Sequence, residues 1–203
     1  GYYGTLKAGG IVVPCNALMV AREVAAQVNN AGAEFLVVAG QMYAAIKAVR
    51  ANTCLKKVIV TNTADYLPPE IQDGSQVVNV VENEATVYLK TFLDAPRLEP
   101  VAVVPADSAI LMYTGGTTGL PKGAELTHKN LVCNTLQMSN WMFGPQAVSR
   151  DERIMTILPM SHSYAMTVCM NLAVLNGFEQ IIIQNPKDFN LFLKTIDKLK
   201  PTF

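Results

Sequence analysis

Residues 113–123 read YTGGTTGLPKG, and this run of glycine, threonine, proline and lysine suits neither a helix nor a strand. It follows AILMY (109–113), whose apolar residues predict a buried strand, and it leads into GAELT (123–127), which predicts another. The run is therefore a loop at the carboxyl end of a strand. Open α/β folds bind their ligands at that edge of the sheet, so we take the loop as the candidate site.

The residues of this loop favour the binding of a polyphosphate. Its glycines permit positive φ angles and a close approach of the backbone, so that successive N–H groups can converge on phosphate oxygens. Its threonines add hydroxyl donors, and its lysine adds a mobile positive charge. The candidate binding residues are Thr114, Gly115, Gly116, Thr117, Thr118, Gly119 and Lys122. The alternative is a solvated hairpin without a ligand, which the ordered pattern of the whole run disfavours.

The loop matches neither of two common nucleotide-binding motifs. A Walker A loop needs Gly-Lys-Ser/Thr at the start of a helix, whereas Lys122 lies between Pro121 and Gly123 and a strand is expected next. The G-x-G-x-x-G fingerprint of dinucleotide-binding folds does not occur in the chain. The sequence therefore predicts a phosphate loop of another kind.

Strand-like runs alternate with helical patterns along the chain, which predicts an α/β fold of mostly parallel sheets flanked by helices. In the first half we expect a helix over 20–31 ended by Gly32, a buried strand over 33–40, a helix over 41–51, strands over 56–62 and 76–81, and a helix over 82–95.

The second half predicts the same alternation. We expect strands over 109–113, 123–127, 153–159 and 179–185, with helices over 128–142, after Ser163 and from Asp188. The last helix should pack on a sheet through Phe192, Leu193, Ile196 and Leu199. Prolines at 96, 100 and 105 predict a junction between subdomains 1–100 and 101–203.

Composition limits the classes of function. Sixteen basic residues balance sixteen acidic ones among 203 residues, so neither nucleic acid nor an anionic membrane is expected as the main partner. No apolar stretch approaches the roughly 18 residues that cross a bilayer. Cys15, Cys54, Cys133 and Cys169 lie far apart beside apolar residues, which predicts buried free thiols rather than a zinc site.

The loop YTGGTTGLPKG resembles the phosphate-binding signature of the adenylate-forming superfamily, which includes acyl-CoA synthetases, aryl-CoA ligases, luciferases and the adenylation domains of peptide synthetases. Residues 1–38 are similar to the amino-terminal part of acyl-CoA synthetases, and LPMSHSYAM (158–166) resembles the family's next motif. The resemblance covers almost the whole chain and is strongest to a medium- or long-chain fatty acyl-CoA ligase.

This resemblance implies the incomplete amino-terminal AMP-binding domain of an enzyme that uses ATP, Mg²⁺ and coenzyme A. Residues 114–119 would wrap the β- and γ-phosphates, Lys122 would contact the departing pyrophosphate, and Thr118 would serve the metal. Many relatives have serine where this chain has Gly115, so backbone N–H groups would replace one hydroxyl donor. The glycine itself looks like the variant of fatty acyl-CoA synthetases.

His162 lies just after the predicted strand 153–159, and the resemblance places it beside the acyl substrate. The alternative to this substrate-binding role is that His162 is a structural histidine. Met160, Met166 and Met170 either line a pocket for flexible alkyl chains or pack in the core. Thr127 is expected to cap the helix that begins at His128, which explains both residues without catalysis.

Relatives carry further site residues, and a mobile carboxyl-terminal domain, beyond the position that matches Phe203. We therefore expect these 203 residues alone to be inactive and assign the activity, with a carboxylic acid, ATP and CoA as partners, to a cytoplasmic parent enzyme. The sequence leaves open whether the parent enzyme forms a homodimer. The alternatives are an aryl-CoA ligase, a peptide-synthetase adenylation domain, or a non-catalytic nucleotide-binding module.

Overall fold

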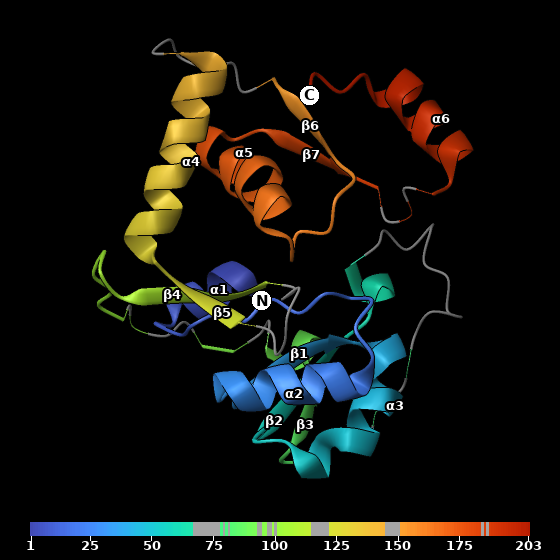
Figure 1. Cartoon of the computed structure of the whole chain (residues 1–203). Helices are drawn as coiled ribbons and strands as arrows, with labels where there is room; N and C mark the ends of the chain where they lie inside the picture. The colour runs from blue at the N-terminus through green and yellow to red at the C-terminus, as the bar shows by residue number, and fades with distance from the viewer. Residues whose placement is uncertain are drawn as a thin grey trace. The chain divides into compact units, whose positions relative to one another are not determined.

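Parallel strands with helices between them recur along the chain, as the sequence predicts, so the α/β fold class is confirmed (Figure 1). The computed structural model describes residues 1–203 except 67–77, 79, 81, 93–94, 97–98, 100, 115–121, 145–150, 184 and 186. The described residues form two compact units. One comprises 1–102 with 113–123, and the other comprises 103–112 with 124–203.

The first unit is built on a parallel three-stranded sheet in the order β1-β2-β3. Its elements are α1 (Tyr2–Lys7), α2 (Ala21–Ala31), β1 (Phe35–Ala39), α3 (Gly40–Val49), β2 (Lys57–Thr61) and β3 (Thr86–Tyr88), with short 3₁₀ turns over Arg50–Asn52, Thr63–Tyr66 and Leu89–Phe92. Its core joins the two longer helices to the central strand through Val24, Val28, Ile46, Leu55, Val58 and Val60. In β2 the buried Val58 and Val60 alternate with three partly exposed residues. Strand β2 pairs with β1 on one side and with β3 on the other, so it lies at the centre of the sheet.

Helix α2 begins and ends where the sequence predicts. Gly32 follows the helix with φ of 63°, a left-handed conformation that glycine adopts without steric cost. At the other end, the N-cap residue is Val20, whose side chain has no oxygen to accept a backbone hydrogen bond. Only half of a capping box remains, in which the Val20 N–H donates to Glu23 Oε2 at 3.0 Å.

Two predictions for this unit are wrong. The helix expected over 82–95 is replaced by β3 and the 3₁₀ turn Leu89–Phe92. Thr86 and Val87 are β-branched and pair with Val58 and Ile59 of β2, so tertiary pairing overrides the local helical pattern. The strand over 33–40 is only partly buried, because Phe35 is 60% exposed. Of the strand expected over 76–81, only Val78 and Val80 are described.

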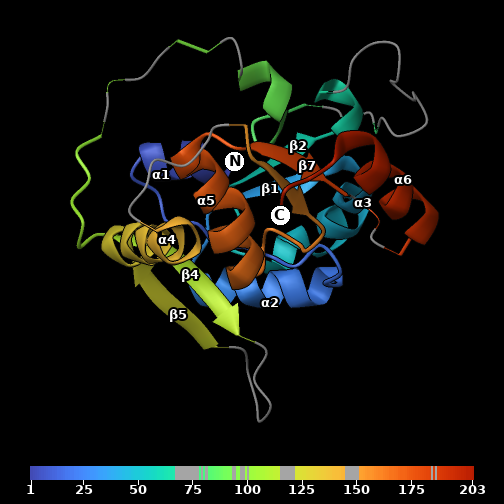
Figure 2. The ribbon, with the colours of Figure 1, turned by 90° about the horizontal axis from the view of Figure 1, so that it is seen from above.

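The second unit contains a parallel pair of strands with helices around it. Its elements are α4 (His128–Phe143), β6 (Arg153–Thr156), the π-helix Ala165–Asn171, α5 (Leu172–Asn176), β7 (Glu179–Ile182) and α6 (Phe189–Leu199). Strands β4 (Ser108–Thr114) and β5 (Lys122–Thr127) form a two-stranded sheet in which they run in opposite directions (Figure 2).

The core of the second unit lies between β6, the π-helix and α5. It contains Ile154, Ala165, Val168, Cys169, Leu172, Ala173 and Phe178, against which Met138, Met142 and Phe143 of α4 pack. Thr127 caps α4 as predicted, because its Oγ1 accepts the Asn130 N–H at 3.2 Å while its own N–H donates to Asn130 Oδ1 at 2.9 Å.

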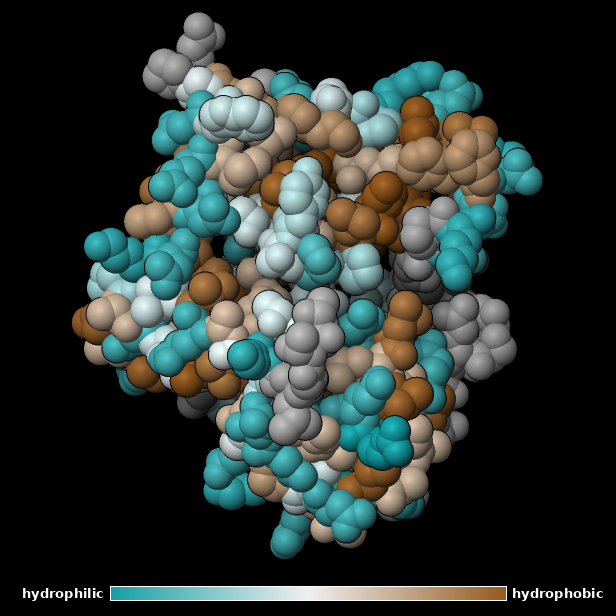
Figure 3. Space-filling model, viewed as in Figure 1, coloured by the Kyte–Doolittle hydropathy of each residue, from teal (hydrophilic) through white to brown (hydrophobic). Residues whose placement is uncertain are grey.

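Helix α6 departs from expectation in its packing. It begins after Asp188, whose carboxylate accepts the Leu191 N–H at 3.0 Å. Phe192, Ile196 and Leu199 are partly buried. Phe189 and Leu193 are 64% and 48% exposed, so the predicted burial through Leu193 is wrong. Apolar side chains show among polar ones at the surface over α6 (Figure 3).

The residues after α6 pair with β6. The Met155 N–H donates to the Phe203 carbonyl at 2.9 Å, and the Phe203 N–H donates to the Arg153 carbonyl at 3.2 Å. A residue bonded to both neighbours of the facing residue is the pattern of a parallel pair. The Phe203 ring also packs against Phe143 and Phe178.

All four cysteines are free, as predicted, but they are not all buried: Cys169 is buried and Cys15 partly so, whereas Cys54 and Cys133 are exposed. Burial raises the pKa of the Cys15 and Cys169 thiols above the usual value. In the described part of the chain, no helix combines the length and hydropathy that a membrane crossing needs.

We expect Val20→Thr to stabilise the protein by about 0.5–1 kcal/mol, because a threonine hydroxyl at the N-cap can accept a hydrogen bond from an N–H of the first turn, which the valine side chain cannot do. Chemical unfolding curves of the two proteins test this. Thr127→Val, which removes the equivalent acceptor from α4, should lower stability by a similar amount. A loss of stability in Val20→Thr would contradict the cap geometry.

Cys133 should be alkylated by iodoacetamide faster than Cys15 and Cys169 at pH 8. A raised pKa leaves less thiolate at a given pH, and the thiolate is the nucleophile. Peptide mass spectrometry over time, on folded and on denatured protein, measures the four rates. Equal rates in the folded protein would contradict the burial of Cys169.

Candidate functional site

The candidate loop joins two strands whose ends are both described. Strand β4 ends at Thr114 and β5 begins at Lys122, and both residues are exposed. The hairpin arrangement therefore keeps Thr114 and Lys122 at the same end of the two-stranded sheet, as the sequence predicts. The other five candidates, Gly115, Gly116, Thr117, Thr118 and Gly119, lie outside the described residues.

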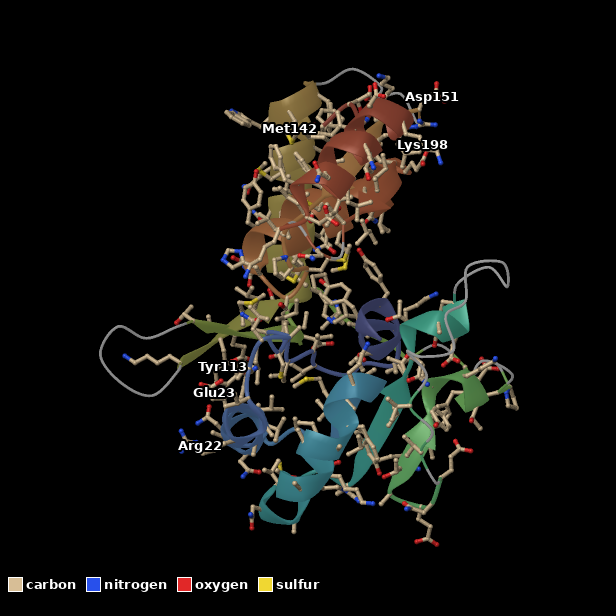
Figure 4. All side chains as sticks on the ribbon, turned by 90° about the vertical axis from the view of Figure 1, so that its right-hand side faces the viewer. Arg22, Glu23, Tyr113, Met142, Asp151 and Lys198 are labelled. Carbon is tan, nitrogen blue, oxygen red and sulfur yellow. The ribbon has the colours of Figure 1, made fainter. Side chains whose placement is uncertain are left out.

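The base of the loop is held by Tyr113, the residue before Thr114. Its hydroxyl donates a hydrogen bond of 2.5 Å to Oδ1 of Asn30, the penultimate residue of α2. Figure 4 labels Tyr113 between the β4–β5 hairpin and α2. The ring also lies over Gly123, where a Cβ atom would come within 3.2 Å of Cε2 and Cζ. One side chain thus touches both ends of the loop and a helix from the same unit.

Packing explains why glycine occupies position 123, in addition to its being part of the motif. A Cβ contact of 3.2 Å is tighter than ordinary van der Waals contact, so an alanine there would push the Tyr113 ring away. At the other end of the hairpin, Ser108 and Glu125 are joined by a side-chain hydrogen bond. The hairpin is therefore fastened at both ends by contacts between β4 and β5.

His162 follows β6 in a tight turn. Its N–H donates to the Pro159 carbonyl and its carbonyl accepts the Met166 N–H, each at 2.9 Å. The exposed imidazole accepts the Tyr164 N–H on Nδ1 at 3.3 Å. When the imidazole is neutral and Nδ1 accepts this bond, the ring hydrogen is on Nε2. His162 can therefore offer an N–H donor from the carboxyl end of β6.

The methionines near His162 differ in surroundings. Met166 is only 2% exposed and belongs to the core, whereas Met160 and Met170 are partly exposed. Core packing is thus the reading that fits Met166. The chain continues from here as a π-helix, which has a wider turn than an α-helix and often occurs near functional sites.

The sequence indicated the loop and His162 but neither Asn30 nor Tyr113. Thr114 and Lys122 lie in the first unit and His162 lies in the second. The partners Asn30 and Tyr113 are 83 residues apart, and no local pattern links them. Among the described residues, no three His, Cys, Asp or Glu side chains gather as a metal site.

Comparison with known proteins places the whole chain in one family. The family model for AMP-binding enzymes matches residues 1–203. The long-chain-fatty-acid–CoA ligase of Bacillus subtilis is 33% identical, over 99% of this chain and 37% of that protein. The chain therefore spans little more than a third of the length of this curated relative.

Solved structures share the fold. The crystal structure of a long-chain-fatty-acid–CoA ligase from Archaeoglobus fulgidus is 29% identical, covers 100% of this chain and 36% of that one, and superposes with a TM-score of 0.77. The anthranilate CoA ligase AuaEII, crystallised with anthranoyl-AMP, has a TM-score of 0.79 at 20% identity, over 99% of this chain and 36% of that one. At that identity the likeness concerns the fold alone. The chain belongs to the family of AMP-binding enzymes.

Proposed function

We propose that the protein containing this chain is an AMP-forming acid–thiol ligase that activates a fatty acid with ATP and transfers it to coenzyme A. The observation that carries the proposal is the family match over residues 1–203, within which the phosphate-loop sequence joins β4 to β5. The B. subtilis relative, named for long-chain fatty acids, supports the substrate class.

The reaction has two displacements. A carboxylate oxygen attacks the α-phosphorus of ATP, a P–O bond breaks, and pyrophosphate leaves with its electrons. The thiol sulfur of coenzyme A then attacks the acyl carbon, the bond to AMP breaks, and the thiol proton passes to solvent. The protein supports such steps by neutralising phosphate charge and aligning the reacting groups.

In this proposal the loop receives the polyphosphate. Thr114 and the backbone of Gly115, Gly116, Thr117, Thr118 and Gly119 donate to the β- and γ-phosphates, and Lys122 neutralises the leaving pyrophosphate. Because Lys122 is exposed at the start of β5, its flexible side chain can reach a ligand bound over the loop.

Magnesium fits the loop by donor chemistry, since a threonine hydroxyl is an oxygen ligand of the kind that Mg²⁺ prefers. Thr118 is the residue we assign to it, and the ion would neutralise phosphate charge. His162, with its Nε2–H, is assigned to the acyl side of the site, where a neutral donor can hydrogen-bond a carboxylate.

The remaining features of the parent protein stay predictions. They are the partial amino-terminal domain with subdomains 1–100 and 101–203, a cytoplasmic location, and an open question of homodimer formation. An aryl acid is the second substrate class, and the anthranilate ligase shares the fold with this chain. The greater identity to fatty-acid ligases favours the alkyl class.

Lys122→Ala should lower ATP–pyrophosphate exchange by the protein containing this chain about tenfold to hundredfold, the usual effect of losing a hydrogen bond to a charged group. The substrate panel should include short, medium and long fatty acids, aryl acids and amino acids. Lys47→Ala, which removes an exposed lysine from α3, is the matched control and should exchange normally.

Exchange that is fastest with fatty acids and weak in Lys122→Ala would support the proposal and rank its substrates. Exchange with aryl acids alone would assign the second class. If no acid supports exchange although the protein is folded and binds ATP, the loop serves binding only and the proposal fails.

We expect the 203-residue chain by itself to form no acyl adenylate. It spans 37% of the length of the B. subtilis relative, and the resemblance places outside it further groups that hold magnesium, bind the ribose and assist adenylation. Incubation with ATP, Mg²⁺ and palmitate, followed by chromatography for palmitoyl-AMP, tests this. Adenylate in amounts that exceed a heat-denatured control would contradict it.

A further inference from the structure

We infer that Asn30 and Tyr113 are positioning residues for the polyphosphate loop, and that their hydrogen bond sets the affinity of the site for MgATP. The inference rests on the proposed function, because it concerns the same loop. Tyr113 opens the motif, but neither side chain is among the residues assigned to bind phosphate. They act through the two strand ends from which the loop departs.

The first argument is the place of Tyr113. Its backbone directly precedes Thr114, and its ring lies over Gly123, which directly follows Lys122. The orientation of one ring therefore constrains where the chain leaves β4 and where it returns to β5. If the ring rotates away from this position, the ammonium group of Lys122 and the hydroxyl of Thr114 are no longer held at a fixed position relative to each other.

The second argument is what holds the ring in place. A tyrosine ring at a strand end can rotate about two bonds, and the hydrogen bond of 2.5 Å to Asn30 Oδ1 selects one orientation. The acceptor is rigid because α2 is anchored in the core by Val24 and Val28. Gln27, also buried, donates to the Pro14 carbonyl at 3.0 Å and fixes the helix further.

The third argument is that the end of α2 is fixed independently of the hairpin. Asn29 accepts the Cys54 N–H on Oδ1 and donates from Nδ2 to the Asn52 carbonyl, both at 2.8 Å. Two adjacent asparagines thus bind two different segments, 52–54 and Tyr113. The Asn30 carboxamide therefore projects from a helix end that the hydrogen bonds of Asn29 hold in place.

The consequence is preorganisation. Donor groups whose positions are set before the ligand arrives, here those of Thr114 and Lys122, lose less conformational entropy when they bind phosphates, so they bind them more tightly. An exposed hydrogen bond has a modest net effect, which corresponds to a change of about threefold to tenfold in affinity. The effect should appear in the KM for ATP and not in the KM for the acid.

The test uses the protein that contains this chain, with MgATP as the probe, in ATP–pyrophosphate exchange at saturating fatty acid. The variants are Asn30→Ala, Asn30→Asp, Tyr113→Phe and the double variant Asn30→Ala with Tyr113→Phe. Asn29→Ala is the matched control, because it removes the neighbouring asparagine without touching the hairpin. Thermal unfolding of each variant reports changes in stability separately.

We expect Asn30→Ala and Tyr113→Phe each to raise the KM for ATP about threefold to tenfold and to leave the KM for the fatty acid unchanged. The double variant should resemble either single one, because both remove the same bond. Asn30→Asp keeps an oxygen acceptor and should stay near the parent value. Asn29→Ala should lower the unfolding temperature without raising the KM for ATP.

The inference is overturned if Asn30→Ala and Tyr113→Phe exchange with an unaltered KM for ATP. It is also overturned if Asn29→Ala raises that KM equally, since the effect would then follow stability. Should the parent protein exchange with no acid, the proposed function fails, and the inference is judged by equilibrium binding of MgATP. Weaker binding by both variants would support it, and equal binding, or none by the parent protein, would overturn it.

Discussion

The parallel pairing of strands is the constraint on which the rest of this structure depends. A parallel neighbour can only be reached by a crossover connection, which is usually a helix that packs back on the sheet. Helix α3 does this between β1 and β2, and the π-helix with α5 does it between β6 and β7. Within each parallel sheet the same geometry puts the carboxyl ends of the strands at one edge, and His162 follows the carboxyl end of β6.

Much of this fold could be predicted because its signals are local. The four-residue spacing of Val24 and Val28 and the glycine at 32 define α2, and Thr127 defines the start of α4. The strand β3 could not be predicted in this way. It is three residues long at the edge of the described sheet, and its pairing with Val58 and Ile59 is decided by residues far away in sequence.

The candidate site also contains residues that local sequence predicts and residues that only the fold reveals. The phosphate loop was evident because its glycines, threonines and lysine form one contiguous pattern. His162 was evident from the motif around it, although the hydrogen bond that its Nδ1 accepts from the Tyr164 N–H is seen only in the structure. Asn30 could not be found from sequence, because nothing near it in the chain distinguishes it from Asn29. Only the fold shows that one asparagine binds residues 52–54 and the other binds Tyr113.

The pair Asn29–Asn30 has an evolutionary consequence. Each residue added to or removed from an α-helix turns everything beyond it by about 100° and shifts it by about 1.5 Å. A single insertion or deletion between Ala21 and Asn30 would therefore detach both asparagines from their partners at once, while Val24 and Val28 lost register with the core. Helix α2 should consequently keep its length among homologues that retain this asparagine pair, and gaps in their alignments should fall outside it.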